Sequence, residues 1–303
     1  MDPSTEPSTA YAAAFGAGTI LAMFVVRRLI ARIVASKAPD ASPESRALGA
    51  GAPRGLLADD KQAVAVCHTG DVLAVFLVGA AVAKNCLHGG SLAKDVVWCA
   101  AFAALGLFLL EMTGLLGVRV LLKQRLRASI KRGNMAAATA AAAHFVATGL
   151  ITSRAMAGSD LKGVGLSLTF FVLAIVTHQI VVGLFRLLTT YDDSEQIEGE
   201  NLAAAISYGG ISLAVAIIVS RALEGGDFPG WALAMSGFGM LSATALGLLP
   251  IRQIVVQWLV LGGRPSFRGG ALDDAIGRDR NAGVAAVEAA SYIGAALAVV
   301  LLA

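Results

Sequence analysis

Residues 201–219 read NLAAAISYGGISLAVAIIV, in which 18 residues without a charged side chain follow Asn201. A run of about 18 or more apolar residues is long enough to cross the hydrocarbon of a bilayer as a helix. The opening of this run recurs as Asn134-Met-Ala-Ala-Ala and as Asn281-Ala-Gly-Val-Ala. Because Asn is a good helix N-cap, the stretch predicts a transmembrane helix that starts at Asn201 and is repeated along the chain.

The whole chain has the composition of a membrane protein. Of its 303 residues, 56% are hydrophobic and 15% are charged, and the mean hydropathy is +0.72. A soluble domain carries roughly 25% charge. We expect an all-α integral membrane protein with eight transmembrane helices. The expected spans are Tyr11–Val34, Ala63–Val82, Val96–Leu122, Met135–Thr152, Val164–Leu188, Leu202–Val219, Trp231–Val256 and Ala282–Leu302.

The odd-numbered helices share a motif near their ends. GLLGVR (114–119) matches GLLPIR (247–252), and the shorter GLFR (183–186) and FVVR (24–27) occupy the corresponding places. Four helical hairpins that each return the chain to the same side form a parallel repeat. We divide the chain into two four-helix units, 1–158 and 159–303. The Arg that closes each motif is interpreted as a side chain that reaches the lipid headgroups.

The repeated openings resemble a bacterial membrane family, domain of unknown function 350. The resemblance rests on Asn201-Leu-Ala-Ala-Ala-Ile with Gly209 and Gly210, and on Asn134-Met-Ala-Ala-Ala with Gly149. The second helix departs from the pattern, because Lys61 stands where Asn is expected. The resemblance implies a location in the inner membrane and four helices in each of two copies. It implies no activity and no catalytic residues.

The basic residues predict the orientation. The segments that link helices within the four hairpins, with their helix ends, hold 19 of the 24 Lys and Arg residues. Basic residues concentrate in cytoplasmic loops. We therefore expect a multi-pass protein of the bacterial inner (plasma) membrane, with cytoplasmic hairpin loops and both termini outside the cytoplasm. The loop YDDSEQIEGEN (191–201) is acidic although it lies on the side predicted to be cytoplasmic. Acidic residues contribute little to topology.

The loops also suggest partners. The segment Ser36–Lys61 is rich in Pro, Ser, Gly and Ala and is expected to be a flexible loop. The segment Arg119–Asn134 has six basic residues and no acidic one, so it suits contact with anionic lipid. A cytoplasmic protein partner and a homo-oligomer are left open. The net charge of +3 does not suggest nucleic acid, and no cofactor is expected.

Ionisable residues within apolar spans are the candidate site, because charge is costly in hydrocarbon and marks functional positions. Counted from the start of each even-numbered helix, His68, Tyr208 and Glu288 lie seven residues in, and Asp71 and His144 lie ten residues in. Residues three apart share a helix face. We expect these faces to converge on a central seam. Glu111 and His178, each eight residues before the Arg of its helix, are expected to add to it.

These residue types suit three kinds of chemistry. The first is a proton relay or cation site, since His titrates near neutral pH. The second is pairing that only locks helix packing, and the third is a metal site. A Walker loop, a dinucleotide fingerprint and a nucleophile elbow are all missing from the sequence, so we do not expect an enzyme. The leading hypothesis is a small-ion or proton-linked channel or transporter. The alternatives are a non-transporting scaffold or envelope-stress partner, and an intramembrane metalloenzyme.

Overall fold

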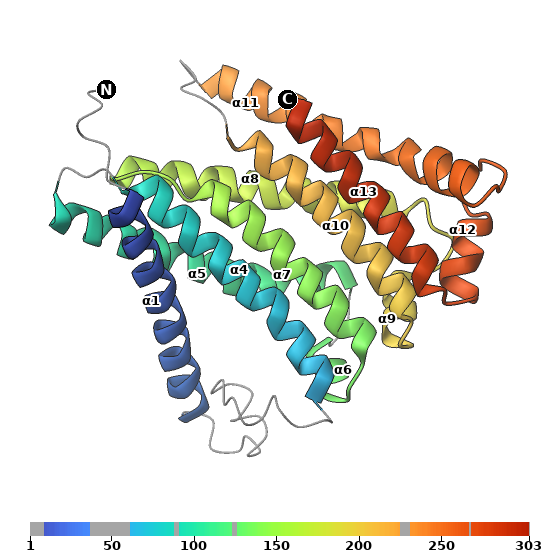
Figure 1. The fold of residues 1–303 in the computed structure, drawn as a ribbon, viewed down its shortest axis with the longest axis horizontal. Coiled ribbons are helices and arrows are strands. Elements are labelled where there is room, and N and C mark those ends of the chain that lie inside the picture. Colours follow the sequence, from blue (N-terminus) through green and yellow to red (C-terminus); the bar gives the residue numbers. More distant parts are fainter. Residues whose placement is uncertain are drawn as a thin grey trace.

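The chain folds as a bundle of long helices (Figure 1). The computed structural model describes residues 9–36, 61–87, 91–122, 126–224, 231–266 and 268–302, and these ranges contain no strand. Eight helices in them are long and apolar enough to cross a membrane. The chain is therefore an all-α, eight-span membrane protein. The predicted flexible loop falls almost entirely on residues 37–60, outside the described ranges.

The spans agree with the expected segments to within a few residues. Most of them extend beyond the expected bounds by up to one turn, because the polar residues that flank each apolar run continue the helix. The spans are α1 (Thr9–Ser36), α4 (Gln62–Cys86), α5 (Leu92–Leu122), α7 (Met135–Ala155), α8 (Leu161–Arg186), α10 (Leu202–Ala222), a seventh span that begins with α11 (Trp231–Ala243), and α13 (Ala282–Leu302).

The seventh span is not one regular helix, contrary to expectation. After α11 it tightens into the 3₁₀-helix η3 (Thr244–Leu248) and then widens into the π-helix η4 (Ile251–Val260). Pro250 lies immediately before η4. Proline has no N–H to donate and its ring crowds the preceding turn, so the α-helical hydrogen-bond pattern cannot continue through this position.

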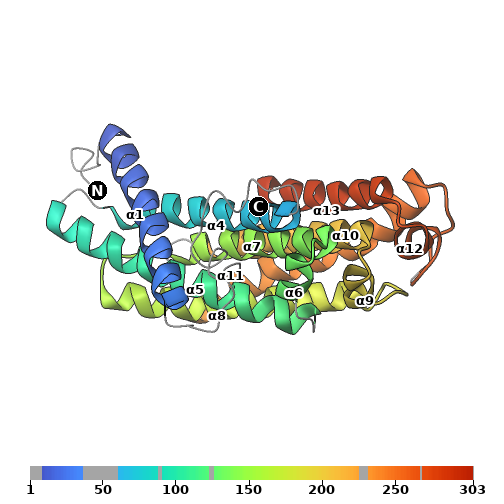
Figure 2. The same ribbon diagram turned by 90° about the horizontal axis from the view of Figure 1, so that it is seen from below.

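The second, fourth, sixth and eighth spans along the chain are called the even helices. They form a central layer in the order α4, α7, α10, α13. Figure 2 shows this row with α5, α8 and α11 along one of its faces, while α1 crosses α4 at the end of the row. The helix α10 is the most buried span and α1 the least. The hairpin loops carry the short helices α6 (Leu126–Lys131), α9 (Asp193–Glu198), α12 (Ala271–Asp273) and the π-helical turn η5 (Asp274–Arg278), and lie at the end of the bundle away from the termini (Figure 1).

Small residues allow the central helices to approach closely. A Cβ on Gly149 of α7 would lie 2.7 Å from the Cα of Ala74 on α4, and one on Gly209 of α10 would lie 2.9 Å from the Cβ of Ala143. Real Cβ contacts are not that short, so only glycine fits at these crossings. In lipid, where apolar side chains gain little by leaving the solvent, such close van der Waals packing drives helix association.

The expected N-caps are present and have a second role. The side-chain oxygens of Asn134 and Asn201 accept from the backbone N–H three residues later. Their amide nitrogens donate to the loop of the following hairpin, at Ile197 O (2.9 Å) and Ile276 O (2.8 Å) respectively. Each Asn thus starts its own helix and ties that helix to the next hairpin.

Candidate functional site

The largest fully buried charged side chain of the described residues is that of Arg252, in the first turn of the π-helix η4. It is 1% exposed and is the largest fully buried side chain. Its Nε donates to Glu288 Oε1 at 2.9 Å, and its Nη2 forms an ion pair with Asp273. Its Nη1 is buried and donates to no described residue. One guanidinium therefore holds two carboxylates and keeps one donor free in the protein interior.

Glu288 has a complete set of partners. It is 1% exposed and lies seven residues into α13, about 10 Å along the helix from its start. Besides Arg252, Ser207 on α10 donates to its Oε2 at 2.5 Å, and Tyr292 donates to its Oε1 at 3.2 Å. Glu288 thus faces the bundle interior, and all of these partners are polar side chains. His68 and His144, which were expected on the same seam, are not among them.

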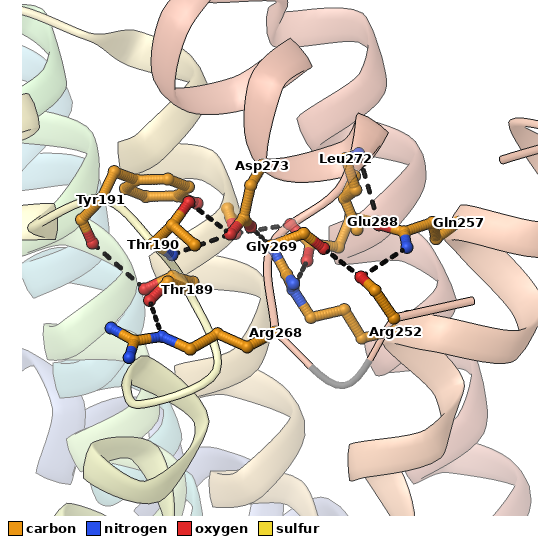
Figure 3. A network of polar contacts seen from close by, with 12 residues as sticks. Thr189, Thr190, Tyr191, Arg252, Gln257, Arg268, Gly269, Leu272, Asp273 and Glu288 are labelled. Carbon is orange, nitrogen blue, oxygen red and sulfur yellow. Dashed lines mark hydrogen bonds and ion pairs between the residues drawn. The ribbon is translucent and has the colours of Figure 1, made fainter. Parts of the chain in front are cut away.

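Asp273 connects this pair to the loops, as Figure 3 shows. Its Oδ2 accepts from the backbone N–H of Thr190 at 2.7 Å and from the Thr190 hydroxyl at 2.8 Å. The segment before Asp273 is anchored by Gln257, whose Nε2 donates to Arg264 O at 2.7 Å. The loop after η4 is therefore fastened both to the π-helix and to the loop after α8.

A second ion pair repeats the first. Arg186 Nε donates to Asp193 Oδ2 at 2.8 Å, and Asp193 is 4% exposed. Asp193 and Asp273 each lie eight residues before the N-cap Asn of the next helix, so the two pairs are equivalent in the repeat. The pKa of Asp193 is raised to about 6, mainly by burial and to a smaller extent by the nearby charge of Glu288, while Arg186 opposes the shift.

The first hairpin holds a separate cluster. Arg27 on α1 pairs with Asp71 on α4 and donates from Nε to Glu111 Oε1 on α5 at 2.7 Å. His68 Nδ1 lies 3.5 Å from Asp71 Oδ2. The side chain of Glu111 is 42% exposed and that of His68 37%, so this cluster is more open than the Arg252 network.

The two remaining candidate histidines face each other between α7 and α8. The rings of His144 and His178 lie 6.5 Å apart between centroids, and each side chain is 1% exposed. His178 Nε2 lies 3.0 Å from Ser212 O, and His144 Nε2 lies 3.4 Å from Thr113 O. The Nδ1 atoms of both are buried without a hydrogen bond to the described residues. Both rings contact backbone carbonyls rather than charged groups.

The expectation of one central seam is wrong. Asp71, His144 and Glu288 each contact the outer helix of their own hairpin, namely α1, α5 and η4. The four even helices lie in a row and not around an axis, so equivalent faces point to successive outer helices instead of to one point. Tyr208 is 2% exposed, and its hydroxyl makes no hydrogen bond to the described residues. Six of the seven candidates thus fall into three clusters, and Tyr208 lies apart from them.

The role given to the repeated arginines also needs correction. Arg252 is fully buried and cannot reach the headgroups, and it forms ion pairs instead. Arg186 and Arg27 also form ion pairs, with side chains that are 19% and 25% exposed. The side chain of Arg119 lies outside the described residues. Sequence reasoning missed Asp193 and Asp273, although their common spacing before an N-cap Asn was a usable signal. Among the described side chains, no three His, Cys, Asp or Glu are grouped so as to hold a metal ion.

Comparison with known proteins supports the repeat. The family model described as Domain of Unknown Function (DUF350) matches residues 9–156 and, a second time, residues 159–302. The resemblance drawn from the Asn-Ala openings is thereby confirmed. No curated protein and no solved structure matches the chain.

Proposed function

The chain belongs to the Domain of Unknown Function (DUF350) family as two tandem copies, and we propose that it is a proton-linked transporter of a small ion. The observation that supports this most is the change of helix type at Arg252. Transporter sites are often built where a membrane helix is interrupted, and π-helical turns are frequent at functional sites. Here the interruption places a fully buried guanidinium against Glu288 and Asp273.

The charges of the network support proton uptake. Arg252 carries one positive charge and faces two carboxylates, so the network has an excess of one negative charge. The neighbouring pair of Arg186 with Asp193 is neutral and does not change this excess. An uncompensated charge is costly in a low-dielectric interior. Binding one proton removes the excess. In this proposal Glu288 receives the proton, because it lies within a membrane span while Asp193 and Asp273 lie in the hairpin loops.

A proton on Glu288 also changes what Arg252 can bind. The neutral carboxyl no longer forms an ion pair, so the guanidinium keeps Asp273 as its only charged partner in the network and can offer Nη1, which has no partner among the described residues, to a small anion. Proton uptake and anion binding would thus occur together, which is the coupling that a proton-linked transporter requires. The clusters at Arg27 and at His144 lie elsewhere and are assigned no step.

The test is flux through purified protein in proteoliposomes. Internal pH would be followed with a trapped dye under an imposed membrane potential, with chloride as the first anion tried. We expect Glu288→Gln to abolish pH-dependent flux while the protein still folds. Glu198→Gln is the matched control, because Glu198 is an exposed carboxylate in the neighbouring loop. Equal flux in wild type and Glu288→Gln would contradict the proposal.

The second candidate is a non-transporting membrane scaffold. It is favoured by the ion pairs of Arg186 with Asp193 and of Arg252 with Asp273, because these bonds fasten two loops to the bundle. Glu195 and Glu198 of α9 are left exposed to a partner. A scaffold predicts no flux in the wild type. It also predicts that Glu288→Leu destabilises the protein much more than Glu288→Gln does.

We propose the bacterial inner membrane as the location, with the loops in the cytoplasm and the termini outside. The distribution of basic residues supports this orientation. The basic segment 119–134 is proposed to contact anionic lipid. Labelling of a single cysteine at Glu195, in a cysteine-free background, tests the topology, and labelling from the periplasmic side would contradict it.

A further inference from the structure

One contact recurs between successive helices of the central layer. Counted from the start of each helix, the ninth residue of one helix meets the eighth residue of the next. Gly70 of α4 faces Ala142 of α7 in this way, and Gly210 of α10 faces Ala289 of α13. The middle interface repeats the contact through Ala143 and Gly209. A second contact joins the thirteenth residue of one helix to the fifteenth of the next, as in Ala74 with Gly149.

The layer is open at both ends, and the same positions are exposed there. On α4, the first helix of the row, the eighth and fifteenth residues are Thr69 and Phe76, and both are exposed. On α13, the last helix, the ninth and thirteenth residues are Ala290 and Gly294, and both are exposed. The equivalent residues at the internal crossings are buried or half-buried. A Cβ on Gly294 would meet nothing within 4 Å.

The N-cap residues show the same open end. Asn134 and Asn201 are 3% and 1% exposed, and each donates to the loop of the hairpin that follows. Asn281 is exposed, and its amide nitrogen donates to none of the described residues. Its side-chain oxygen still caps α13 through Val284 N at 3.1 Å. The Asn281 amide is equivalent to the Asn134 and Asn201 amides that bond the next hairpin. It therefore lies on the surface at the end of the row.

At the other end of the row, α1 and α4 enclose an apolar groove. Its volume is about 680 Å³, and Gly16, Ile20 and Phe24 of α1 line it together with Phe76 and Ala80 of α4. Each later hairpin packs against the even helix of the hairpin before it, and both of its helices take part. For example, α5 and α7 form one hairpin, and both pack against α4. Within this chain no even helix precedes α4, so this position beside α1 and α4 is unfilled by the described residues.

We propose that a second copy of the chain continues the layer. The free face of α13 in one copy packs against α4 beside α1 in the next, with Ala290 against Thr69 and Gly294 opposite Phe76. The ring of Phe76 replaces the small residue found at the fifteenth position of the other even helices, and Gly294 supplies the room for it. This inference is independent of the transport proposal, because it rests on the packing repeat alone.

The interface joins two different surfaces of the same molecule. Such a head-to-tail contact closes into a ring if the rotation allows and otherwise continues as a row. Both forms keep the membrane-spanning direction, because each internal step of the layer already does so. A symmetric dimer, which brings the same face of both copies together, is not the assembly that the repeat predicts.

Disulfide cross-linking in native membranes tests the contact. Two differently tagged copies would be co-expressed, with Cys67, Cys86 and Cys99 replaced by Ala. One copy carries Thr69→Cys and the other Ala290→Cys. We expect oxidation to link the two tags to each other. Val176→Cys is the control, because Val176 is an exposed apolar residue about as deep on α8 as Ala290 is on α13. A copy with Val176→Cys should form no disulfide with a copy that carries Ala290→Cys.

The outcomes separate the alternatives. Failure of the Thr69→Cys and Ala290→Cys copies to link, or equal linking with the Val176→Cys control, would mean that lipid covers these faces and would overturn the proposal. Linking of Thr69→Cys only to itself would show a symmetric dimer and overturn it as well. As a second measurement, Ala290→Trp should shift the protein in lipid nanodiscs to monomers by native mass spectrometry, while Val176→Trp should not. Neither experiment depends on flux, so each can fail or succeed without the transport proposal.

Discussion

Replacing Arg252 by Met should destabilise the protein more than any other single loss of charge in the second unit. The change removes the cation that faces both Glu288 and Asp273 and leaves two carboxylates that are 1% and 3% exposed. Removing one partner of a buried ion pair costs about 3–5 kcal/mol. Because one guanidinium serves two carboxylates here, we expect a loss of unfolding free energy near the upper end, about 5 kcal/mol.

The measurement is the unfolding free energy in mixed micelles, from titration with a denaturing detergent followed by far-UV circular dichroism. Arg278→Met is the matched control. The Arg278 side chain is 69% exposed and pairs with Asp279 at 2.9 Å. Exposed ion pairs contribute about 0–1 kcal/mol, so this variant should resemble the wild type.

A triple variant separates loss of charge balance from loss of packing. In Arg252→Met with Asp273→Asn and Glu288→Gln, no uncompensated charge remains, so most of the lost stability should return. The non-additivity of the three changes gives the coupling energy directly. If Arg252→Met loses no more unfolding free energy than Arg278→Met, or if the triple variant is less stable than Arg252→Met, charge balance in the buried network does not stabilise the fold.

Three further predictions concern packing, capping and pH. Gly210→Leu should cost more than about 3 kcal/mol, because a Cβ at Gly210 already overlaps Ala289 and overpacking alone costs about 1–3 kcal/mol; Gly239→Leu, where a Cβ meets nothing within 4 Å, should cost far less in the same titration. Asn201→Ala should lose about 1–2 kcal/mol through its cap, and more through its bond to Ile276 O, whereas Asn201→Asp should recover only the cap. Asp193 has a folded-state pKa of about 6, above its ordinary 3.8, so its protonation stabilises the folded state fully below about pH 3.8, and this contribution is lost as pH rises through 6. Asp193→Asn should remove that slope from the pH dependence of stability, and an unchanged slope would contradict the assignment.

The composition and the repeats of the sequence were sufficient for the architecture. Apolar runs of span length predict transmembrane helices directly, because the bilayer fixes both the length and the apolar character of a spanning helix. Asn134 and Asn201 could be identified as caps because capping depends only on the residues within one turn. The common hairpin orientation followed from counting spans, so that the parallel repeat was predictable before any packing was known.

The site was only partly predictable from the sequence. Features that depend on the local sequence could be predicted, and features that depend on contacts between distant segments could not. The sequence identified Glu288 as a buried acid, since a carboxylate inside an apolar run must be partnered or neutral. It could not show that the partner is Arg252, 36 residues earlier, because that depends on how η4 lies against α13. The spacing of Asp193 and Asp273 was visible in the sequence, but their burial comes from loops that fold back onto the bundle.

The arrangement of the four even helices is what only the tertiary structure decided. Equivalent faces in a repeat meet at one point if the helices surround an axis, and they point to successive neighbours if the helices form a row. The sequence alone fits both, because a periodic pattern fixes which face of each helix packs but not the angle between one helix and the next. Close contacts such as Gly70 with Ala142 and Gly210 with Ala289 set that angle, and so they determine where the buried charges lie and leave the row open at its two ends.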